Sequence, residues 1–237
     1  MKNIFKALFL LVALTTVAGC GQSEFEDDSV TTNASAPNDQ SDFEATKALA
    51  DAGDAQSQFD LGQMYANGTR IVEQDDAEAS KWYRLAAEQG FSPAQSELGF
   101  MYTNGRGVAQ NYQEAIKWLR LAAEQGNNYA QIRLGSLYGD SRVVGGNDEE
   151  AMKWFRLAAE QGSAIAQIAL GSKYENGLGV DQSNSSAYIW FSVVAAQGSA
   201  MAASDRDRVA AKLTPQALEL AQSQATRCFE SHFQDCD

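Results

Sequence analysis

The chain has 237 residues, of which 44% are apolar, and this is enough to bury the core of one or two domains. Its formal net charge of −13 repels phosphate backbones, which argues against nucleic acid as a partner. The three cysteines are unequally placed, because Cys20 lies near the start while Cys228 and Cys236 lie close to the end of the chain.

The first 19 residues have the features of a secretion signal. Two lysines precede an apolar run at 7–14, which is too short to span about 30 Å of hydrocarbon. Residues 17–20, Val-Ala-Gly-Cys, resemble the lipobox of bacterial lipoproteins, in which cleavage before the cysteine precedes its acylation. The resemblance implies lipidation of Cys20 and stable attachment to a membrane. The alternative is an ordinary signal peptide with an incidental cysteine.

The segment after the signal is predicted to be a flexible tether over residues 20–42. Residues 21–42 hold six acidic side chains, no basic ones, and many Ser, Thr, Asn and Asp, a composition that does not bury enough apolar surface to fold. Gly21 stands where an Asp retains enterobacterial lipoproteins in the inner membrane. The resemblance therefore favours the outer membrane of the bacterial cell envelope, with the chain facing the periplasm.

The body of the chain, residues 43–198, repeats every 36 residues, which predicts a stack of similar supersecondary units. Tryptophan, glycine, a Leu-Gly pair and tyrosine each form a series at this interval. The series are Trp82, Trp118, Trp154 and Trp190; Gly90, Gly126, Gly162 and Gly198; Gly62, Gly99, Gly135 and Gly171, each after a leucine; and Tyr65, Tyr102, Tyr138 and Tyr174. One extra residue lies in the first unit's loop.

Each unit is predicted to be a helical hairpin, as in residues 92–125. Apolar residues recur at helical spacing in the second half of the unit, and Gly126 lies where a helix ends with a left-handed residue. The glycine of each Leu-Gly pair is unfavourable inside a helix, so we expect another helix to pack closely against it. The tryptophans are interpreted as core. Capping boxes are predicted at three second-helix starts: Asp75 with Glu78, Asn111 with Glu114, and Asn147 with Glu150.

This pattern resembles the Sel1-like repeats, which are related to tetratricopeptide repeats, over about residues 43–213. The matching residues are Ala94-Gln95, Leu98-Gly99, Met101-Tyr102, Gly105-Arg106-Gly107-Val108, Glu114-Ala115, Trp118, Ala122-Ala123 and Gly126. The third unit departs in its loop, residues 139–146. The resemblance implies an all-α fold, a right-handed α-solenoid with a concave surface that binds other proteins. Many members are regulatory adaptors.

The two ends of the solenoid are predicted to be capped differently. Residues 43–52 have the pattern of a lone second helix, whereas the second helix of the fourth unit has Ile189, Ser192 and Ala196 where earlier units carry charges. A covering segment is needed there, and residues 199–237 are predicted to supply it with helices at 199–213 and 215–230. Cys228 and Cys236 are predicted to form a disulfide in an oxidising compartment.

No catalytic or metal-binding pattern is recognised, so we predict no enzyme and no cofactor. His232, the only histidine, lies between Cys228 and Cys236, and a disulfide-bonded cysteine is no nucleophile. No zinc-ligand spacing, phosphate-binding loop or serine-hydrolase motif occurs. The charges of the second helices are interpreted as solvated pairs. These pairs are Glu78–Lys81, Glu114–Lys117 and Glu150–Lys153 at i,i+3, and Arg84–Glu88, Arg120–Glu124 and Arg156–Glu160 at i,i+4.

Protein-binding residues are expected on the first helices, at the positions where the units differ from one another. Two such rows are Asp60, Glu97, Arg133 and Ala169, and Gln63, Phe100, Ser136 and Ser172. From these rows we predict a binding site at Glu97, Phe100, Arg133 and Ser136, because arginine and aromatic residues dominate binding energy at interfaces. The alternative is that these positions are only exposed and tolerant of change.

The favoured function is a membrane-anchored scaffold or adaptor that binds proteins in the bacterial envelope. One alternative is a module that binds peptidoglycan or another glycan. A second is weak β-lactam hydrolysis, which has been linked to cysteine-rich relatives. Those relatives carry a cysteine pair in nearly every repeat, and the repeats of this chain carry none.

Overall fold

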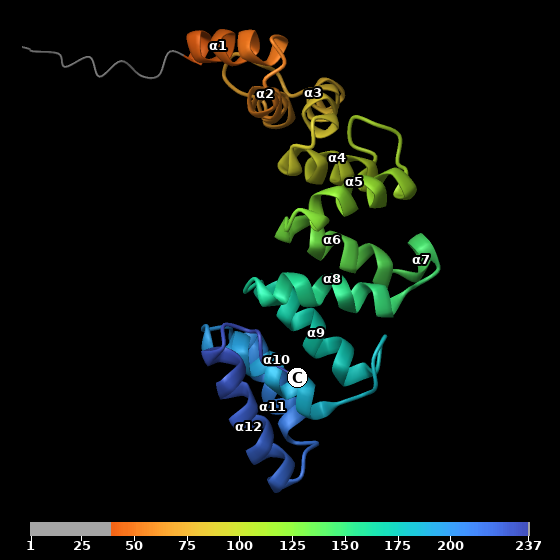
Figure 1. Ribbon diagram of the computed structural model, residues 1–237, viewed down its shortest axis with the longest axis vertical. Coiled ribbons are helices and arrows are strands. Elements are labelled where there is room, and N and C mark those ends of the chain that lie inside the picture. The colour runs from red at the N-terminus through yellow and green to blue at the C-terminus, as the bar shows by residue number, and fades with distance from the viewer. Residues whose placement is uncertain (1–38, 237) are drawn as a thin grey trace, which may run out of the picture. The chain divides into compact units, whose positions relative to one another are not determined.

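The computed structural model describes residues 39–236, and this part of the chain consists of α-helices and turns without a strand (Figure 1). The helices are α1 (Asp39–Asp51), α2 (Ala55–Asn67), α3 (Asp76–Glu88), α4 (Ser92–Asn104), α5 (Tyr112–Glu124), α6 (Asn128–Gly139), α7 (Ser141–Val144), α8 (Asp148–Glu160), α9 (Ala164–Asn176), α10 (Asn184–Ala196), α11 (Ala200–Ala210) and α12 (Pro215–Glu230). The predicted helical hairpins are confirmed.

The helices from α1 to α11 form a stack in which consecutive long helices pack together, as Figure 1 shows from α1 to α10. The first helices of the four repeats are α2, α4, α6 and α9, and the second helices are α3, α5, α8 and α10. This arrangement is the expected α-solenoid. Helix α1 begins at Asp39, so residues 39–42 are helical and do not belong to the tether. The signal segment, Cys20 and the rest of the tether lie outside the described residues.

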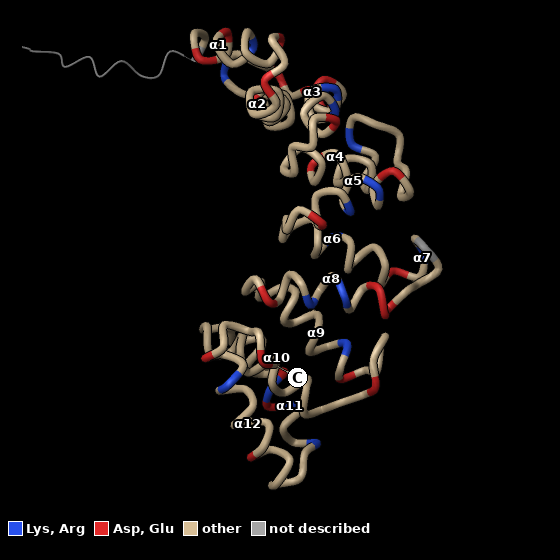
Figure 2. Tube along the Cα trace, viewed as in Figure 1, with Lys and Arg blue, Asp and Glu red and all other residues tan. Residues whose placement is uncertain are grey.

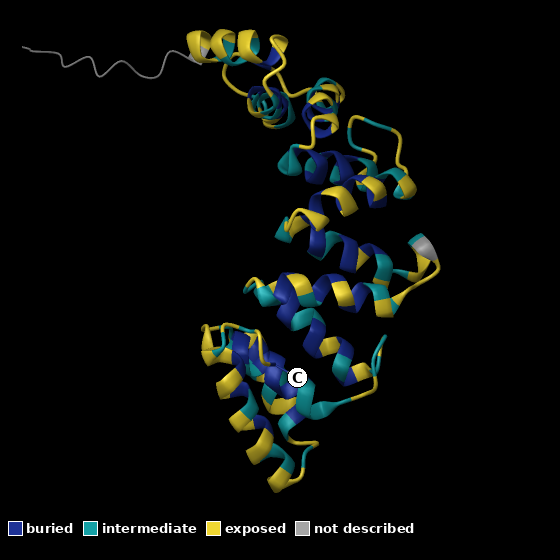
Figure 3. Cartoon of the chain, viewed as in Figure 1, coloured by how far each residue is buried: buried dark blue, intermediate teal, exposed yellow. Residues whose placement is uncertain are grey.

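The Leu-Gly pairs mark close contacts between the two helices of a repeat, as predicted. A methyl group on Gly62 would lie 2.7 Å from the ring of Tyr83, and one on Gly171 would lie 2.7 Å from the ring of Phe191. Any side chain at these positions would displace a buried neighbour. Trp118, Trp154 and Trp190 are buried and Trp82 is half-buried, which agrees with their interpretation as core. Figure 3 shows that buried residues recur along the whole stack of helices.

The second helices begin with only half of the predicted capping box. The side chains of Asp75, Asn111 and Asn147 do accept hydrogen bonds from the main-chain N–H of the expected glutamates. The glutamates do not reach back, because the main-chain N–H groups of the three caps donate to the carbonyls of Tyr65, Tyr102 and Tyr138. The reciprocal half of the prediction was therefore wrong. The side chains of the three glutamates instead form the predicted i,i+3 ion pairs. The distances from the lysine Nζ to the carboxylate oxygen are 2.6, 3.5 and 3.0 Å for Lys81, Lys117 and Lys153.

The arginines of the second helices pair with tyrosines of the next repeat. Arg84 donates to the hydroxyl of Tyr102 and Arg120 to that of Tyr138, where Glu88 and Glu124 were the predicted partners. Arg156 donates to the hydroxyl of Tyr174 at 2.7 Å. The interpretation of Arg84 and Arg120 as solvated i,i+4 partners of Glu88 and Glu124 was therefore wrong. These arginines connect each hairpin to its successor, which explains why tyrosine recurs at the 36-residue interval.

Buried glutamines form a second series of links between repeats that the sequence analysis did not predict. Gln95 donates to the carbonyl of Ala87 at 3.1 Å and accepts a hydrogen bond from Gln125 at 2.8 Å. The same pair of bonds recurs with Gln58 and Gln89, Gln131 and Gln161, and Gln167 and Gln197. Hydrogen bonding on both sides satisfies amides that would otherwise be costly to bury.

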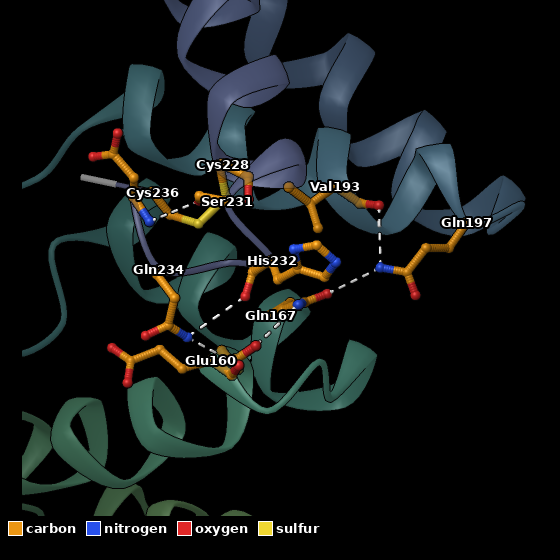
Figure 4. Close-up of a disulfide and its surroundings, with 11 residues drawn as sticks. Glu160, Gln167, Val193, Gln197, Cys228, Ser231, His232, Gln234 and Cys236 are labelled. Carbon is orange, nitrogen blue, oxygen red and sulfur yellow. Dashed lines mark hydrogen bonds between the residues drawn. A yellow bond between two sulfur atoms is a disulfide. The ribbon is translucent and has the colours of Figure 1, made fainter.

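The C-terminal segment packs on the last repeat. Helix α12 starts after the N-cap Thr214 and packs on α10, and a disulfide joins Cys228 to Cys236 (Figure 4). The closing turn then reaches α8, where Gln234 donates to the carbonyl of Glu160 at 3.3 Å. His232 is exposed at this turn.

Candidate functional site

Three of the four predicted binding residues lie together on two neighbouring first helices. Glu97 and Phe100 belong to α4, and Arg133 belongs to α6. The guanidinium carbon of Arg133 lies 4.0 Å from the centroid of the Phe100 ring and 4.2 Å from that of Tyr129. Contacts of this length between a guanidinium and an aromatic ring are attractive. The tertiary structure therefore joins positions that are more than thirty residues apart in the sequence.

Arg133 lies at the junction of these two repeats, in contact with Phe100 and Tyr129. It donates a hydrogen bond to the hydroxyl of Tyr129, while its Nε is buried without a hydrogen-bond partner within residues 39–236. Burial lowers the pKa of Arg133, and the charge of Glu97 partly offsets this. Tyr129 is 43% exposed, so an aromatic residue remains accessible beside the positive charge of Arg133.

A polar pocket of about 230 Å³ lies beside this cluster, where α2, α3 and α4 meet. Its lining residues are Gln63, Ala66, Asn67, Tyr83, Glu97, Phe100, Met101 and Arg106. Two of the predicted binding residues, Glu97 and Phe100, thus contribute to its wall. Gln63, from the second variable row, also lines it.

Arg106 closes one side of the pocket with a bidentate ion pair to Asp76. Its Nε donates at 2.9 Å and its terminal nitrogen at 2.6 Å to the two carboxylate oxygens, and the same nitrogen donates to the carbonyl of Ala66 at 3.2 Å. The hydrogen bond from Arg106 lowers the pKa of Asp76. Gly107, the next residue, lies against the main chain of Asp76, where no side chain fits. The loop is therefore fixed, and the charge of Arg106 is already neutralised.

Glu97 and Tyr83 also line the pocket, but neither has a contact partner like the one that Asp76 provides for Arg106. Burial raises the pKa of Glu97, although Arg133 and Arg106 lower it in part. Burial and the neighbouring charge of Glu97 also raise the pKa of Tyr83, which is 3% exposed. Neither side chain forms a hydrogen bond or an ion pair within residues 39–236. The pocket thus presents a half-buried carboxylate and an unpaired phenol hydroxyl.

Ser136 does not belong to this cluster. It is exposed on α6, and its hydroxyl donates to the carbonyl of Ile132 at 3.0 Å. Sequence reasoning in turn missed Tyr83, Arg106 and Tyr129. A signal existed for Arg106, which lies in the quoted Gly-Arg-Gly-Val loop, and for Tyr129, an aromatic residue one helical turn before Arg133.

The family model named Sel1 repeat matches residues 55–91, 92–127, 128–163 and 164–199. This chain belongs to the Sel1 repeat family. The four segments coincide with the four hairpins of the structure, and the first is one residue longer than the others, as the extra loop residue predicts. Sel1 repeats indicate a scaffold for protein–protein interactions, and this Sel1 repeat chain is assigned that general role.

Two solved structures resemble this Sel1 repeat chain. A protective antigen of uropathogenic Escherichia coli with an SLR fold is 35% identical, with a TM-score of 0.69 over 80% of this chain and 40% of that one. A Sel1 repeat protein from Oxalobacter formigenes is 32% identical, with a TM-score of 0.65 over 80% of this chain and 79% of that one. The chain thus spans less than half of the E. coli protein. No curated protein sequence matches it.

In residues 39–236, no group of three His, Cys, Asp or Glu side chains is placed to hold a metal ion. Within the same range, no helix is both long and apolar enough to cross a membrane.

Proposed function

We propose that this Sel1 repeat chain is a membrane-anchored adaptor of the bacterial cell envelope and that it holds a partner protein on helices α4 and α6. The observation that carries the proposal is the stacking of Arg133 on Phe100 and Tyr129 beside an open polar pocket. Arginine and aromatic side chains supply most of the binding energy at protein interfaces. Here they are held on rigid helices, so little conformational entropy is lost when a partner binds.

The anchor of this adaptor would be Cys20. The lipobox-like residues 17–20 support lipidation, and the acidic segment that follows supports a spacer between membrane and repeats. The disulfide between Cys228 and Cys236 supports an oxidising compartment such as the periplasm. Gly21 supports sorting to the outer membrane.

The binding site is tested by crosslinking and affinity capture in living cells. The variant Phe100→Ala with Arg133→Ala is compared with the wild type and with a control, Lys153→Ala with Leu157→Ala, on the exposed side of α8. We expect one envelope protein to be captured by the wild type and the control and to be lost from the Phe100/Arg133 variant. Equal capture by all three proteins would exclude this surface.

The anchor is tested by cell fractionation and labelling with a fatty acid. Cys20→Ser should abolish incorporation of label and prevent processing at residue 20. Gly21→Asp should retain label but move the protein from the outer to the inner membrane. Labelling of the Cys20→Ser variant would contradict the anchor, and an unchanged location of the Gly21→Asp variant would contradict the sorting.

A further inference from the structure

The pocket between α2, α3 and α4 has an unbalanced charge. Arg106 is neutralised by its bidentate pair with Asp76, whereas Glu97 has no ion-pair partner within 4.0 Å in residues 39–236. Arg133, the other nearby cation, stacks on Phe100 and does not line the pocket. The side chain that enters the pocket therefore meets a carboxylate that has no contact partner and is only partly offset by the charges of Arg133 and Arg106.

The hydrogen-bonding groups of the pocket are also incompletely used. Tyr83 as a whole is 3% exposed, but its hydroxyl oxygen is open to the pocket and forms no hydrogen bond within residues 39–236. Gln63 and Asn67 of α2 line the same wall, and each amide offers both donors and an acceptor. A ligand with several donors is therefore able to bind the carboxylate of Glu97 together with oxygens of Tyr83 and the two amides.

An aromatic ring completes the site. Phe100 lines the pocket, and it also receives the guanidinium of Arg133 at 4.0 Å. Aromatic faces attract cations, and a planar guanidinium is able to stack on a ring while donating hydrogen bonds in its plane. A volume of about 230 Å³ accommodates one long side chain together with a few waters.

We propose that this pocket binds the cationic side chain of an arginine or lysine on the partner protein, with Glu97 as its counter-ion, Tyr83 and the amides of α2 as acceptors, and Phe100 as a stacking surface. The inference rests on the proposed adaptor function, because it names the chemistry of the partner segment at that same site. Arginine fits better than lysine, since only its planar fork satisfies the carboxylate and the other acceptors together.

An anionic ligand is the opposite possibility, and the geometry disfavours it. The Nε and one terminal nitrogen of Arg106 already donate hydrogen bonds to Asp76 and Ala66. Arg106 therefore attracts a bound anion only weakly, and Glu97 repels it. The net charge of −13 adds a field that attracts cationic segments over the whole chain.

The experiment is an NMR titration of the full chain with three short peptides that are identical except for a central Arg, Lys or Glu. We expect the Arg peptide to shift the resonances of residues lining the pocket, the Lys peptide to do so more weakly, and the Glu peptide to leave them unchanged. The matched variants are Glu97→Gln, which keeps the shape and removes the charge, and Glu124→Gln, an exposed control on α5. Glu97→Gln should weaken binding of the Arg peptide at least tenfold, and Glu124→Gln should leave it unchanged.

A stability measurement separates loss of the site from loss of the fold. Because burial raises the pKa of Glu97, its charge disfavours the folded state near pH 7, and Glu97→Gln should keep or raise the melting temperature. Tyr83→Phe keeps the ring that packs on Gly62 and removes the hydroxyl, so it should weaken binding of the Arg peptide several-fold. Equal shifts with the Glu peptide, or full affinity in the Glu97→Gln variant, would overturn the inference.

The outcomes also distinguish this inference from the proposed function. If the peptides do not bind but the Phe100/Arg133 variant loses its partner in cells, the adaptor surface stands and the cationic pocket is wrong. If the Arg peptide binds at the pocket but the variant keeps its partner, the pocket stands and the adaptor surface is wrong.

Discussion

Helices α8 and α10 occupy the same place in consecutive repeats, yet their outward surfaces are opposite in character. Lys153 of α8 has a side chain that is 70% exposed, whereas the equivalent Ile189 of α10 is 2% exposed. Leu157 is 43% exposed and its equivalent Val193 is 1% exposed. Figure 2 shows charges along α8, while α10 carries none.

The neighbour of a repeat thus decides which of its positions belong to the core. Both helices keep the tryptophan and phenylalanine that face the hairpin, Trp154 and Phe155 in one and Trp190 and Phe191 in the other. Only α10 is also covered by α12, so its second face becomes apolar as well. Helix α10 is therefore buried on two sides, against its own hairpin and against α12.

Removal of α12, which covers α10, should have the largest effect on stability. A chain ending at Leu213 lacks α12 and exposes Tyr188, Ile189 and Val193. Because each buried large apolar side chain contributes about 1.5–3 kcal/mol, we expect a loss of at least about 4 kcal/mol in the free energy of unfolding. Chemical denaturation measures this loss, and hydrogen exchange should place it in α9 and α10 rather than α4. A chain without α12 that unfolds at the same denaturant concentration would contradict the capping role.

Exchange of the equivalent side chains Ile189 and Lys153 should have unequal consequences in α10 and α8. Ile189→Lys places an ammonium group in the interface under α12 and should cost about 3 kcal/mol, because a buried charge there has no partner. The reciprocal Lys153→Ile changes only an exposed position and should stay within about 0.5 kcal/mol. Urea denaturation of both variants checks the contrast; similar losses would mean that the two faces are not different.

The disulfide should have the next largest effect. It closes a short loop, with a sequence separation of eight residues, that fixes the end of α12 against α8 and α10. Loop-closure entropy predicts that Cys228→Ser with Cys236→Ser costs about 2.5 kcal/mol. Denaturation of the oxidised wild type, the reduced wild type and the double variant checks this prediction. The reduced wild type and the variant should agree with each other, and both should fall below the oxidised protein.

The ion pairs at the C-terminal end should give the smallest of these effects. Burial alone would raise the pKa of Glu175, but hydrogen bonds from Lys212 and Arg208 of the C-terminal segment outweigh it and lower the pKa. A lowered pKa means that the stabilisation is present above the unfolded value, near pH 4.3, and is lost as pH falls through the folded value. Glu175→Gln should cost about 2 kcal/mol at pH 7, since both cations are nearly half exposed.

Glu150→Gln is the matched control for this prediction, because its partner Lys153 lies on the solvated face of α8. It should cost only a few tenths of a kcal/mol. Thermal unfolding between pH 3 and pH 7 should show a smaller pH dependence for the Glu175→Gln variant than for the wild type. Identical pH profiles of wild type and variant would contradict the assignment.

Sequence reasoning identified those parts of the protein that depend on local patterns. The spacing of Trp82, Trp118, Trp154 and Trp190 set the length of a repeat, and the last helix, predicted at 215–230, has the same bounds as α12. Charges missing from residues 184–196 indicated that this helix is covered. Comparison of the units with one another also selected Glu97, Phe100 and Arg133 as positions that packing does not determine.

The contacts between repeats were decided only by the tertiary structure. Which side chains meet across two hairpins depends on the rotation and separation of helices about thirty residues apart, and no local pattern records either quantity. For that reason Arg84 pairs with Tyr102 rather than Glu88, and the glutamines form a buried series. The same rotation places Arg133 on Phe100 and leaves Glu97 beside Tyr83 without an ion-pair partner. Ser136 belongs to the same variable row as Phe100, but its hydroxyl donates to the carbonyl of Ile132 in its own helix.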